Sequence, residues 1–169
     1  MTASEPEDFD LEVLSHLDSV YRVALWLCGD PIEAHDLTQD TYERAFRARA
    51  TFTRTNVRAW LLTILRHHFF NVRRRRALAA EVAIEEAERV PSGPVPELPS
   101  GLVRRDIEAA LAELPQELRL PLLMADVEEM SMAEIAEALD WPVGTVKSRL
   151  WRARIRLGTL LREYRRSES

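Results

Sequence analysis

The stretch SMAEIAEALDWPVGTVKSRLWRARIRL, residues 131–157, decides the fold of the second half of this chain. It opens with Ser131 and Glu134, which are spaced as in a capping box at a helix N-terminus. Apolar residues at helical spacing then predict a short helix, a turn at Asp140–Trp141 and a long helix over about Val143–Glu163. A short helix, a tight turn and a longer basic helix are typical of a helix-turn-helix, whose second helix enters the DNA major groove.

One side of the long helix is apolar and the other is basic. The apolar side is expected to pack on the preceding helices, and it comprises Val143, Val146, Leu150, Ile155 and Leu157. Lysine and arginine pair with guanine acceptors or with phosphates, and serine pairs with either. The candidate residues for reading DNA are Thr145, Lys147, Ser148, Trp151 and Arg152. For Trp151, packing in the core explains the residue equally well, and that alternative stays open.

Charge is segregated along the chain, although the formal net charge is only −5. Residues 1–43 hold eleven acids and one base, whereas residues 44–80 hold ten arginines and no acid. Residues 81–140 are acidic again, and residues 141–169 carry eight bases against two acids. Two basic blocks, each preceded by an acidic one, indicate two polyanion-binding modules in tandem. The alternative interpretation is a set of solvated faces that balance their neighbours.

A proline-rich segment separates the two modules. Residues 90–101, VPSGPVPELPSG, hold four of the nine prolines in the chain. Proline removes a backbone donor and breaks helices, so this composition is typical of an extended linker. We therefore predict an all-α protein with two small helical domains, residues 1–80 and 102–169, joined by a flexible linker over 81–101.

The first module reads as three helices. The first, over residues 11–28, is expected to bury Leu11, Leu14, Leu17, Val20, Tyr21, Ala24, Leu25 and Cys28. Gly29 is expected to end it, and Asp30 and Pro31 to cap and begin the next helix. That helix, about 31–48, is expected to turn Ile32, Leu37, Tyr42, Ala45 and Phe46 inward and Asp36, Gln39, Asp40 and Glu43 outward. The third helix, over 57–76, ends in four arginines.

The second module begins with two further helices. They are predicted over residues 102–114 and 116–129, divided at Pro115. Pro121 lies within the second of them, where it indicates either a kink or a first-turn position.

Composition argues against several other classes of protein. No stretch approaches the roughly 20 uncharged apolar residues that span a membrane, and the acidic N-terminus does not resemble a secretory signal. The single cysteine, Cys28, excludes an internal disulfide framework and is expected to be buried. Adjacent histidines at His67 and His68 point about 100° apart on a helix, which disfavours a shared metal ion. No phosphate-binding, nucleophile-elbow or zinc-protease motif appears, so we expect no enzyme and no cofactor.

Three ordered stretches resemble the bacterial extracytoplasmic-function sigma factors, the smallest sigma-70-type transcription initiation factors. GDPIEAHDLTQDTYERAF, residues 29–46, is similar to regions 2.1–2.2 of that family. VRAWLLTILRHHFFNVRRRR, residues 57–76, is similar to regions 2.3–2.4, and the stretch from Leu114 to Leu157 is similar to region 4. Within the last, PVGTVKSRLWRAR is the most diagnostic piece.

The resemblance implies partners for the first module. Helix 31–48 would dock on the clamp helices of the β′ subunit of core RNA polymerase through Asp36, Leu37, Gln39 and Asp40. The −10 promoter element would be opened by capture of a flipped base, which needs a loop with aromatic and amide groups. The residues implied are Phe52, Arg54, Asn56, Arg58, Trp60, His67 and Asn71, with Arg73, Arg74, Arg75 and Arg76 on phosphates.

The resemblance also implies partners for the second module. Its long helix would read the −35 element through the candidates given above, with Arg149 on the DNA backbone. Leu122, Leu123 and Met124 would meet the β flap of the polymerase or pack in the core. An anti-sigma factor would hold the protein inactive in the bacterial cytoplasm, with any membrane tether supplied indirectly by that partner.

The chain departs from the family pattern in the first and second modules alike. His67 and Asn71 stand where Asn and Asp are common, which leaves the identity of the captured base open. Asp140 stands where glycine is more usual, and aspartate tolerates the left-handed conformation of a turn. Trp141 is unusual at its position, and the sequence offers no reason for it.

Two functions from other classes fit part of the pattern. A helix-turn-helix transcriptional regulator would dimerise and bind duplex DNA without polymerase. An adaptor with basic helices would bind an acidic protein and show no preference for nucleic acid. Affinity for core polymerase compared with affinity for bare DNA distinguishes all three functions.

Overall fold

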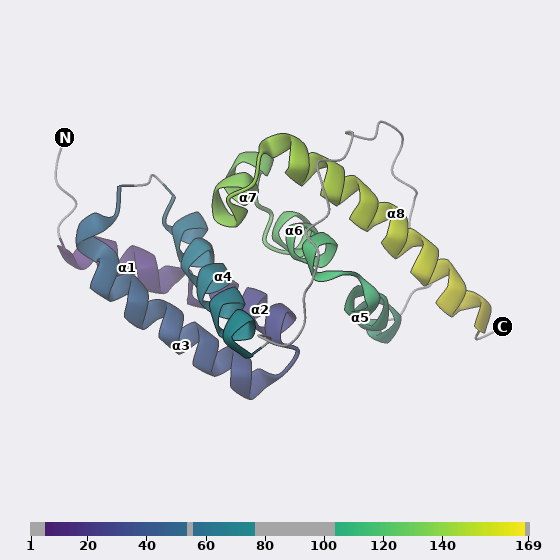
Figure 1. Ribbon diagram of the computed structural model, residues 1–169, viewed down its shortest axis with the longest axis horizontal. Coiled ribbons are helices and arrows are strands. Elements are labelled where there is room, and N and C mark those ends of the chain that lie inside the picture. The colour runs from purple at the N-terminus through teal and green to yellow at the C-terminus, as the bar shows by residue number, and fades with distance from the viewer. Residues whose placement is uncertain (1–5, 54–55, 77–103, 168–169) are drawn as a thin grey trace. The chain divides into compact units, whose positions relative to one another are not determined.

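The structure is a computed structural model that describes residues 6–53, 56–76 and 104–167. Within these ranges the chain forms eight α-helices, one short 3-10 helix and no strand (Figure 1). The helices form two compact units, one built on α1 to α4 and the other on α5, α6 and α8. The all-α prediction is therefore confirmed. The predicted linker and both of its boundaries lie outside the described residues.

The first unit is a bundle of helices around an aliphatic core. Its elements are α1 (Pro6–Ser15), α2 (Leu17–Cys28), α3 (Pro31–Ala48), the 3-10 helix η1 (Arg49–Thr51) and α4 (Val57–Arg76). Helix α4 supplies Leu61, Leu62 and Leu65, each completely buried, and spans the predicted residues. Val20 and Val23 of α2 pack into the same core. A continuous apolar stripe on α4 is what fixes its arginine-rich end at one edge of the unit.

The predicted single helix over residues 11–28 is wrong, because the chain forms two helices there. His16 lies between α1 and α2 with φ −94° and ψ 6°, outside helical geometry. This break changes which residues face inward, so Leu11, Leu14 and Leu17 are 66%, 49% and 45% exposed. Val13, which was not part of the predicted stripe, is completely buried instead.

The boundary between α2 and α3 is confirmed in detail. Gly29 adopts a left-handed conformation with φ 72°, and its N–H donates to the carbonyl of Leu25. The Asp30 carboxylate accepts from the backbone N–H groups of Ile32 and Glu33 at 2.9 and 3.0 Å. Pro31 occupies the first helical position. Local capping chemistry therefore sets the start of α3.

The two faces of α3 follow the prediction with one exception. Leu37, Tyr42 and Ala45 are buried, and Phe46 is half-buried. Ile32 was expected to face inward but is 74% exposed, because it lies in the first turn, before the buried face of α3 begins at Ala34.

The second unit packs α8 (Val143–Ser167) against α5 (Arg104–Glu113) and α6 (Gln116–Asp126). Helix α6 begins directly after Pro115, as predicted. Pro121 lies inside α6, past its first turn, so the first-turn alternative is wrong. The side chain of Pro121 is buried, where its ring adds to the apolar core.

Helix α7 (Met132–Leu139) starts directly after Ser131, and Asp140 follows it with φ 55°. This left-handed turn is the one predicted, and α8 then continues to Ser167, four residues beyond the expected Glu163. Val146, Leu150 and Leu157 are buried as expected. Val143 is 41% exposed because it is the first residue of α8, and Ile155 is half-buried.

Candidate nucleic-acid interface

The first candidate surface begins where η1 leads toward α4. Phe52 follows η1 in an extended conformation, and its ring lies 4.9 Å from that of Trp60 in the first turn of α4. Trp60 is only 9% exposed, whereas Phe52 is half-buried. The Asn56 Oδ1 atom accepts from the N–H of Ala59 at 2.8 Å, so Asn56 also caps α4. Of the two rings, that of Phe52 is therefore the more accessible, and the buried ring of Trp60 packs against it.

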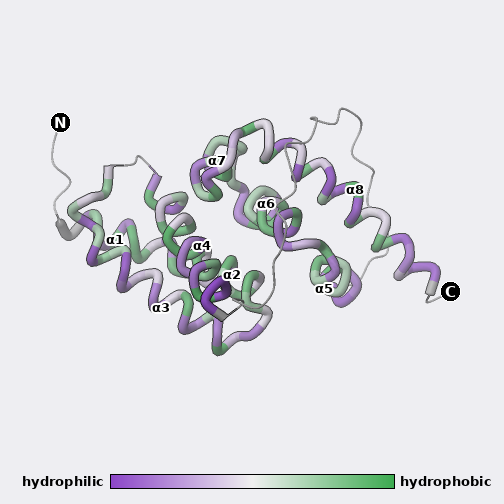
Figure 2. The backbone as a smooth tube through the Cα atoms, in the orientation of Figure 1, coloured by the Kyte–Doolittle hydropathy of each residue, from purple (hydrophilic) through white to green (hydrophobic). Residues whose placement is uncertain are grey.

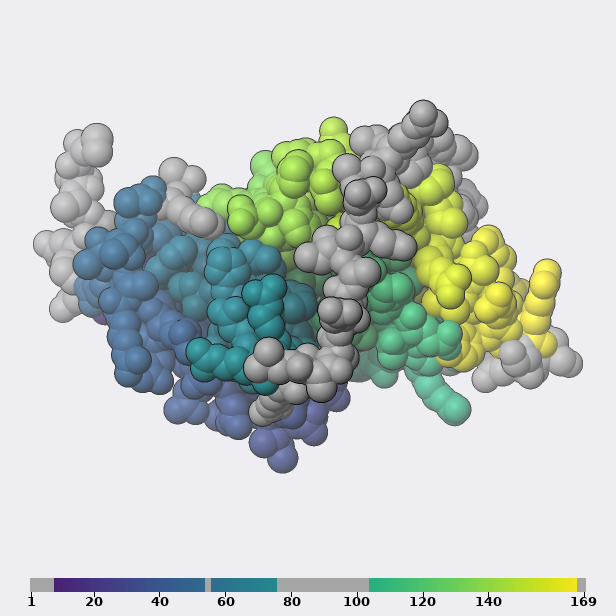
Figure 3. Space-filling view, in the orientation of Figure 1, coloured from purple at the N-terminus to yellow at the C-terminus, as the bar shows by residue number. Residues whose placement is uncertain are grey.

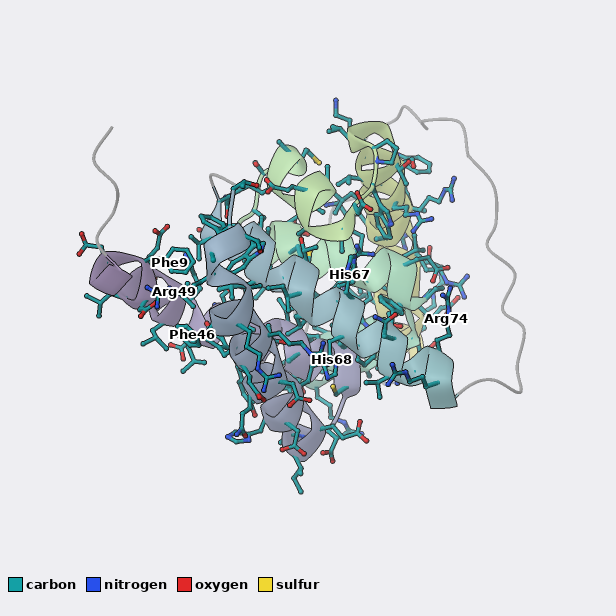
Figure 4. The ribbon with its side chains drawn as sticks, turned by 60° about the vertical axis from the view of Figure 1, so that its left-hand side comes forward. Phe9, Phe46, Arg49, His67, His68 and Arg74 are labelled. Atoms are coloured by element: carbon teal, nitrogen blue, oxygen red, sulfur yellow. The ribbon has the colours of Figure 1, made fainter. Side chains whose placement is uncertain are left out.

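The ring of Phe9, from α1, completes this aromatic cluster. It lies 5.2 Å from Phe52 and 6.0 Å from Trp60, measured between ring centroids. The sequence analysis missed Phe9 because its position near the chain start gives no signal that it meets residues more than 40 positions away. Figure 4 shows Phe9 close to Arg49, which belongs to η1.

The polar side chains of α4 diverge onto different sides of the helix. His67 is exposed, and its Nε2 atom lies 2.7 Å from Nη2 of Arg66. His68 is turned toward α3, where its Nε2 lies 2.9 Å from a carboxylate oxygen of Asp40 (Figure 4). The two histidines therefore have separate partners. Asn71 is exposed one turn further along, and Arg58 is half-buried in the first turn.

The arginine-rich end of α4 is exposed. Arg73, Arg74 and Arg75 all face solvent, and Arg74 projects at the end of the helix in Figure 4. The guanidinium of Arg73 also lies 4.7 Å from the centre of the Phe69 ring, a cation–π contact that orients it. Arg54 and the side chain of Arg76 lie outside the described residues. Exposed arginines on one helix end suit phosphate groups.

Helix α3 presents an acidic face next to this basic helix. Asp36, Gln39 and Asp40 are exposed, as predicted, with 74% of the Asp36 side chain and 51% of the Asp40 side chain accessible. Leu37 is only 7% exposed, so it supports this face from the core and does not lie on it. Carboxylates repel DNA phosphates, which makes this face suited to a protein.

The second candidate surface is the N-terminal half of α8. Lys147 is exposed, and Thr145, Trp151 and Arg152 are half-buried. Ser148 is 4% exposed, and its hydroxyl donates to the carbonyl of Thr145 at 3.0 Å. The structure therefore brings Lys147 to the surface but not the hydroxyl of Ser148.

Polar contacts at two points fix α8 within its unit. Arg154 donates to Asp126 of α6 at 2.7 Å. Near the other end, the Tyr164 hydroxyl donates to the Glu113 carboxylate of α5, and this hydrogen bond raises the pKa of Tyr164. The last turns of α8 are hydrophilic in Figure 2, and their side chains stand at the surface in Figure 3. These contacts hold α8 within its unit, and the basic side chains that remain exposed on it are Lys147, Arg156, Arg162, Arg165 and Arg166.

Trp141 has a specific contact with α8. The guanidinium of Arg149 lies 4.0 Å from the centre of the Trp141 ring, a short cation–π distance. Trp141 precedes α8 in the turn, and Arg149 lies in the second turn of the helix. The unusual tryptophan therefore orients one of the basic residues predicted to contact DNA.

Metal sites, reactive thiols and membrane spans each require a particular arrangement of residues. Among the described residues, no group of three histidine, cysteine or acidic side chains is arranged to hold a metal ion. Cys28 is half-buried, and burial raises the pKa of its thiol, which keeps it protonated. In the same part of the chain, no helix is both long and apolar enough for a membrane span.

These features define a class of protein: an all-helical, two-unit protein with a helix-turn-helix, two exposed basic surfaces and a separate acidic face. Family models narrow the class. Residues 13–78 match "Sigma-70 region 2" and residues 104–157 match "Sigma-70, region 4". The chain belongs to the extracytoplasmic-function sigma factors of the sigma-70 family.

Individual relatives of the chain are themselves named as sigma factors. The chain is 36% identical to the sigma factor SigE of Mycolicibacterium smegmatis over 92% of its own length and 62% of that protein. It is 34% identical to EcfG of Rhodopseudomonas palustris, covering 89% of this chain and 83% of that protein. The structure is similar to the sigma factor RpoE of Bartonella quintana, solved with the anti-sigma factor NepR. That match has a TM-score of 0.73 and 31% identity, covering 92% of this chain and 98% of RpoE.

Proposed function

We propose that this protein directs core RNA polymerase to a specific set of promoters and helps to open them, acting by binding alone and catalysing no reaction. The observation that carries the proposal is the pair of oppositely charged surfaces within one unit. Exposed Asp36 and Asp40 on α3 suit a protein partner, whereas exposed Arg73–Arg75 on α4 suit DNA. A sigma factor needs both, because it joins a polymerase to a promoter. We place the protein in the bacterial cytoplasm, where RNA polymerase acts.

The acidic face of α3 is the proposed site for the β′ clamp helices of the polymerase. Asp36, Gln39 and Asp40 form it, and the buried Leu37 holds their helix in place. Until the polymerase covers this face, its carboxylates repel phosphate. We therefore expect the free protein to bind duplex DNA weakly, and the holoenzyme to bind it well.

The −10 element is proposed to meet the surface formed by Phe52 and α4. Phe52 offers an accessible ring on which an unstacked base can lie, with Trp60 behind it. Exposed His67 and Asn71 supply polar groups further along α4, and Arg73–Arg75 would follow the phosphates. Binding energy obtained only from the opened strand favours melting, since the closed duplex cannot make the same contacts.

The −35 element is proposed to meet the start of α8. Lys147 and Arg152 are the leading candidates for base edges, and Arg149 and Thr145 for the backbone. Trp151 is half-buried, and we assign it a packing role at the same surface. Ser148 contributes less, because its hydroxyl is buried and donates a hydrogen bond to the carbonyl of Thr145.

Two further partners belong to the proposal. An anti-sigma factor is expected, because RpoE of Bartonella quintana was solved with one and shares 31% identity with this chain. A contact with the β flap would have to avoid Leu122, Leu123 and Met124, which are 3%, 3% and 0% exposed. Core packing is the role that we assign to those three residues.

Transcription with purified components tests the proposed function. The protein is mixed with bacterial core RNA polymerase and genomic DNA, and the 5′ ends of the transcripts are sequenced. Initiation at a few sites that share two spaced motifs is expected. Initiation no different from that of core polymerase alone would overturn the proposal and would favour a regulator that binds duplex DNA without polymerase.

The contact between Trp141 and Arg149 gives a specific prediction at the −35 element. Trp141→Leu keeps an apolar side chain but removes the ring that orients Arg149. Because a surface cation–π contact is worth about 0.5–1 kcal/mol, we expect roughly threefold weaker binding of the holoenzyme to duplex −35 DNA. Competition binding measures the change, with Val143→Ala as the control in the same segment. Equal affinities for the two variants would show that the stack does not serve DNA binding.

A further inference from the structure

The first seven of the ten residues of α1 precede residue 13, where the match to sigma-70 region 2 begins. No role is assigned to it by that match, yet its side chains reach the proposed −10 surface. We propose that Phe9 and Asp10 of α1 are positioning residues for promoter opening, because they hold Phe52 and η1 in place. The inference rests on the proposed function and adds to it a segment that the family match leaves out.

The aromatic cluster is the first support for this role. The Phe9 ring lies within 5.2 Å of Phe52 and 6.0 Å of Trp60, while Phe52 and Trp60 are 4.9 Å apart. All three ring pairs are tilted, with interplanar angles of 49°, 54° and 57°. Tilted and edge-to-face pairs are favourable geometries for aromatic rings. Phe9 therefore contacts both Phe52 and Trp60, and it limits how far the Phe52 ring can rotate.

An ion pair gives the second support. Nη1 of Arg49, in η1, lies 3.2 Å from Oδ2 of Asp10. Both side chains are a little more than one third exposed, so water weakens the pair but does not remove its directing effect. Since η1 leads directly into Phe52, fixing Arg49 also fixes the path of the chain into the aromatic cluster.

Helix α1 is itself anchored, which it must be if it positions other residues. Val13 is completely buried, and its carbonyl accepts from the Tyr42 hydroxyl of α3 at 3.0 Å. Burial, with a smaller contribution from Asp18, raises the pKa of Tyr42 to about 12, so this donor stays protonated at any physiological pH. The contacts of Phe9 and Asp10 thus connect η1 and α4 to a helix that α3 holds from the other end.

The physical consequence concerns the step at which a base is unstacked. A ring that is already oriented loses little conformational freedom when a base stacks on it, so more of the stacking energy favours the open strand. A freely rotating Phe52 ring would have to be ordered at that moment. Loss of Phe9 should therefore slow opening, without weakening the binding of polymerase through α3 or of −35 DNA through α8.

The test compares three variants in the full-length protein assembled with core polymerase. Phe9→Leu keeps an apolar side chain but removes the ring, and Phe9→Tyr keeps the ring. Leu11→Ala is the control on the same helix, since Leu11 is 66% exposed. The promoter is one found by the transcription experiment above, with a fluorescent base analogue in the non-template −10 strand. The measurements are the rate of opening, the affinity for core polymerase, the affinity for −35 duplex and the thermal unfolding midpoint.

We expect Phe9→Leu to slow opening by about tenfold, the effect of losing two aromatic pairs, with both affinities within twofold of the unsubstituted protein. Phe9→Tyr should open the promoter at nearly the original rate, and Leu11→Ala should be unchanged. Equal opening rates for Phe9→Leu and Leu11→Ala would overturn the inference. So would a parallel loss of polymerase affinity or folding, because the role would then be purely structural. If the unsubstituted protein opens no promoter, the proposed function fails first, and the two failures are thereby distinguished.

Discussion

Replacing Lys147 and Arg152 together by alanine is expected to weaken binding of the holoenzyme to its −35 element by about 100-fold. Lys147 is exposed near the start of α8, and Arg152 lies further along the helix, half-buried. A well-placed contact to a base edge is worth about 1–3 kcal/mol of discrimination, so two such contacts account for a change of this size. Equilibrium competition between promoter and scrambled duplexes measures it.

Arg162→Ala is the matched control for that pair, because it removes one positive charge from an exposed site on the same helix. It should weaken promoter and scrambled DNA alike and only slightly. If the double variant also weakens both duplexes equally, Lys147 and Arg152 contact phosphates only. The assignment of base reading to them would then be wrong, although the helix would still bind DNA.

Reversing two charges on α3 is expected to abolish assembly with core polymerase. Asp36→Lys with Asp40→Lys replaces two exposed carboxylates by ammonium groups on the face proposed for the clamp helices. The acidic face is proposed to meet a positively charged surface of the polymerase, so two lysines there would place like charges opposite one another. Such a juxtaposition costs several kcal/mol, and the affinity for core polymerase should fall by roughly 100-fold or more. Titration of labelled protein with core polymerase gives the dissociation constants.

Two controls make that result interpretable. Asp18→Lys reverses an exposed charge on α2, away from the proposed face, and should assemble normally. Asp40 also pairs with His68 of α4, so Asp36→Lys alone separates loss of the polymerase contact from loss of that pair. Normal assembly of the double variant, with an unchanged unfolding midpoint, would rule out this face as the docking surface.

Local signals in the sequence predicted the boundary between α2 and α3 and the turn before α8. Gly29, Asp30 and Pro31 end one helix and begin the next by capping and backbone preference, which involve only neighbouring residues. Asp140 likewise adopts the left-handed turn expected between α7 and α8. The outward acidic face of α3 also followed from periodicity, because charged side chains at helical spacing share one side. The family resemblance then supplied the partner that we propose for each surface.

Periodicity did not reveal which apolar residues are covered. Leu11, Leu14 and Leu17 have the spacing of a buried stripe but are exposed, since the break at His16 turns Val13 inward in their place. Ile32 is exposed for a comparable reason, at a helix end that its neighbours do not reach. Spacing shows which residues share a face, whereas burial depends on whether another element packs against it.

The sequence by itself determined the all-helical class, the capped boundary between α2 and α3 and the charges of the two modules, because these depend on residues close together in the chain. Only the tertiary structure decided that Phe9 meets Phe52 and Trp60, and that Trp141 stacks on Arg149. Such contacts form when separate elements pack in one register among many that local preferences allow. The residues that orient the proposed DNA surfaces are therefore set by packing, while the residues that carry their charge can be read directly from the chain.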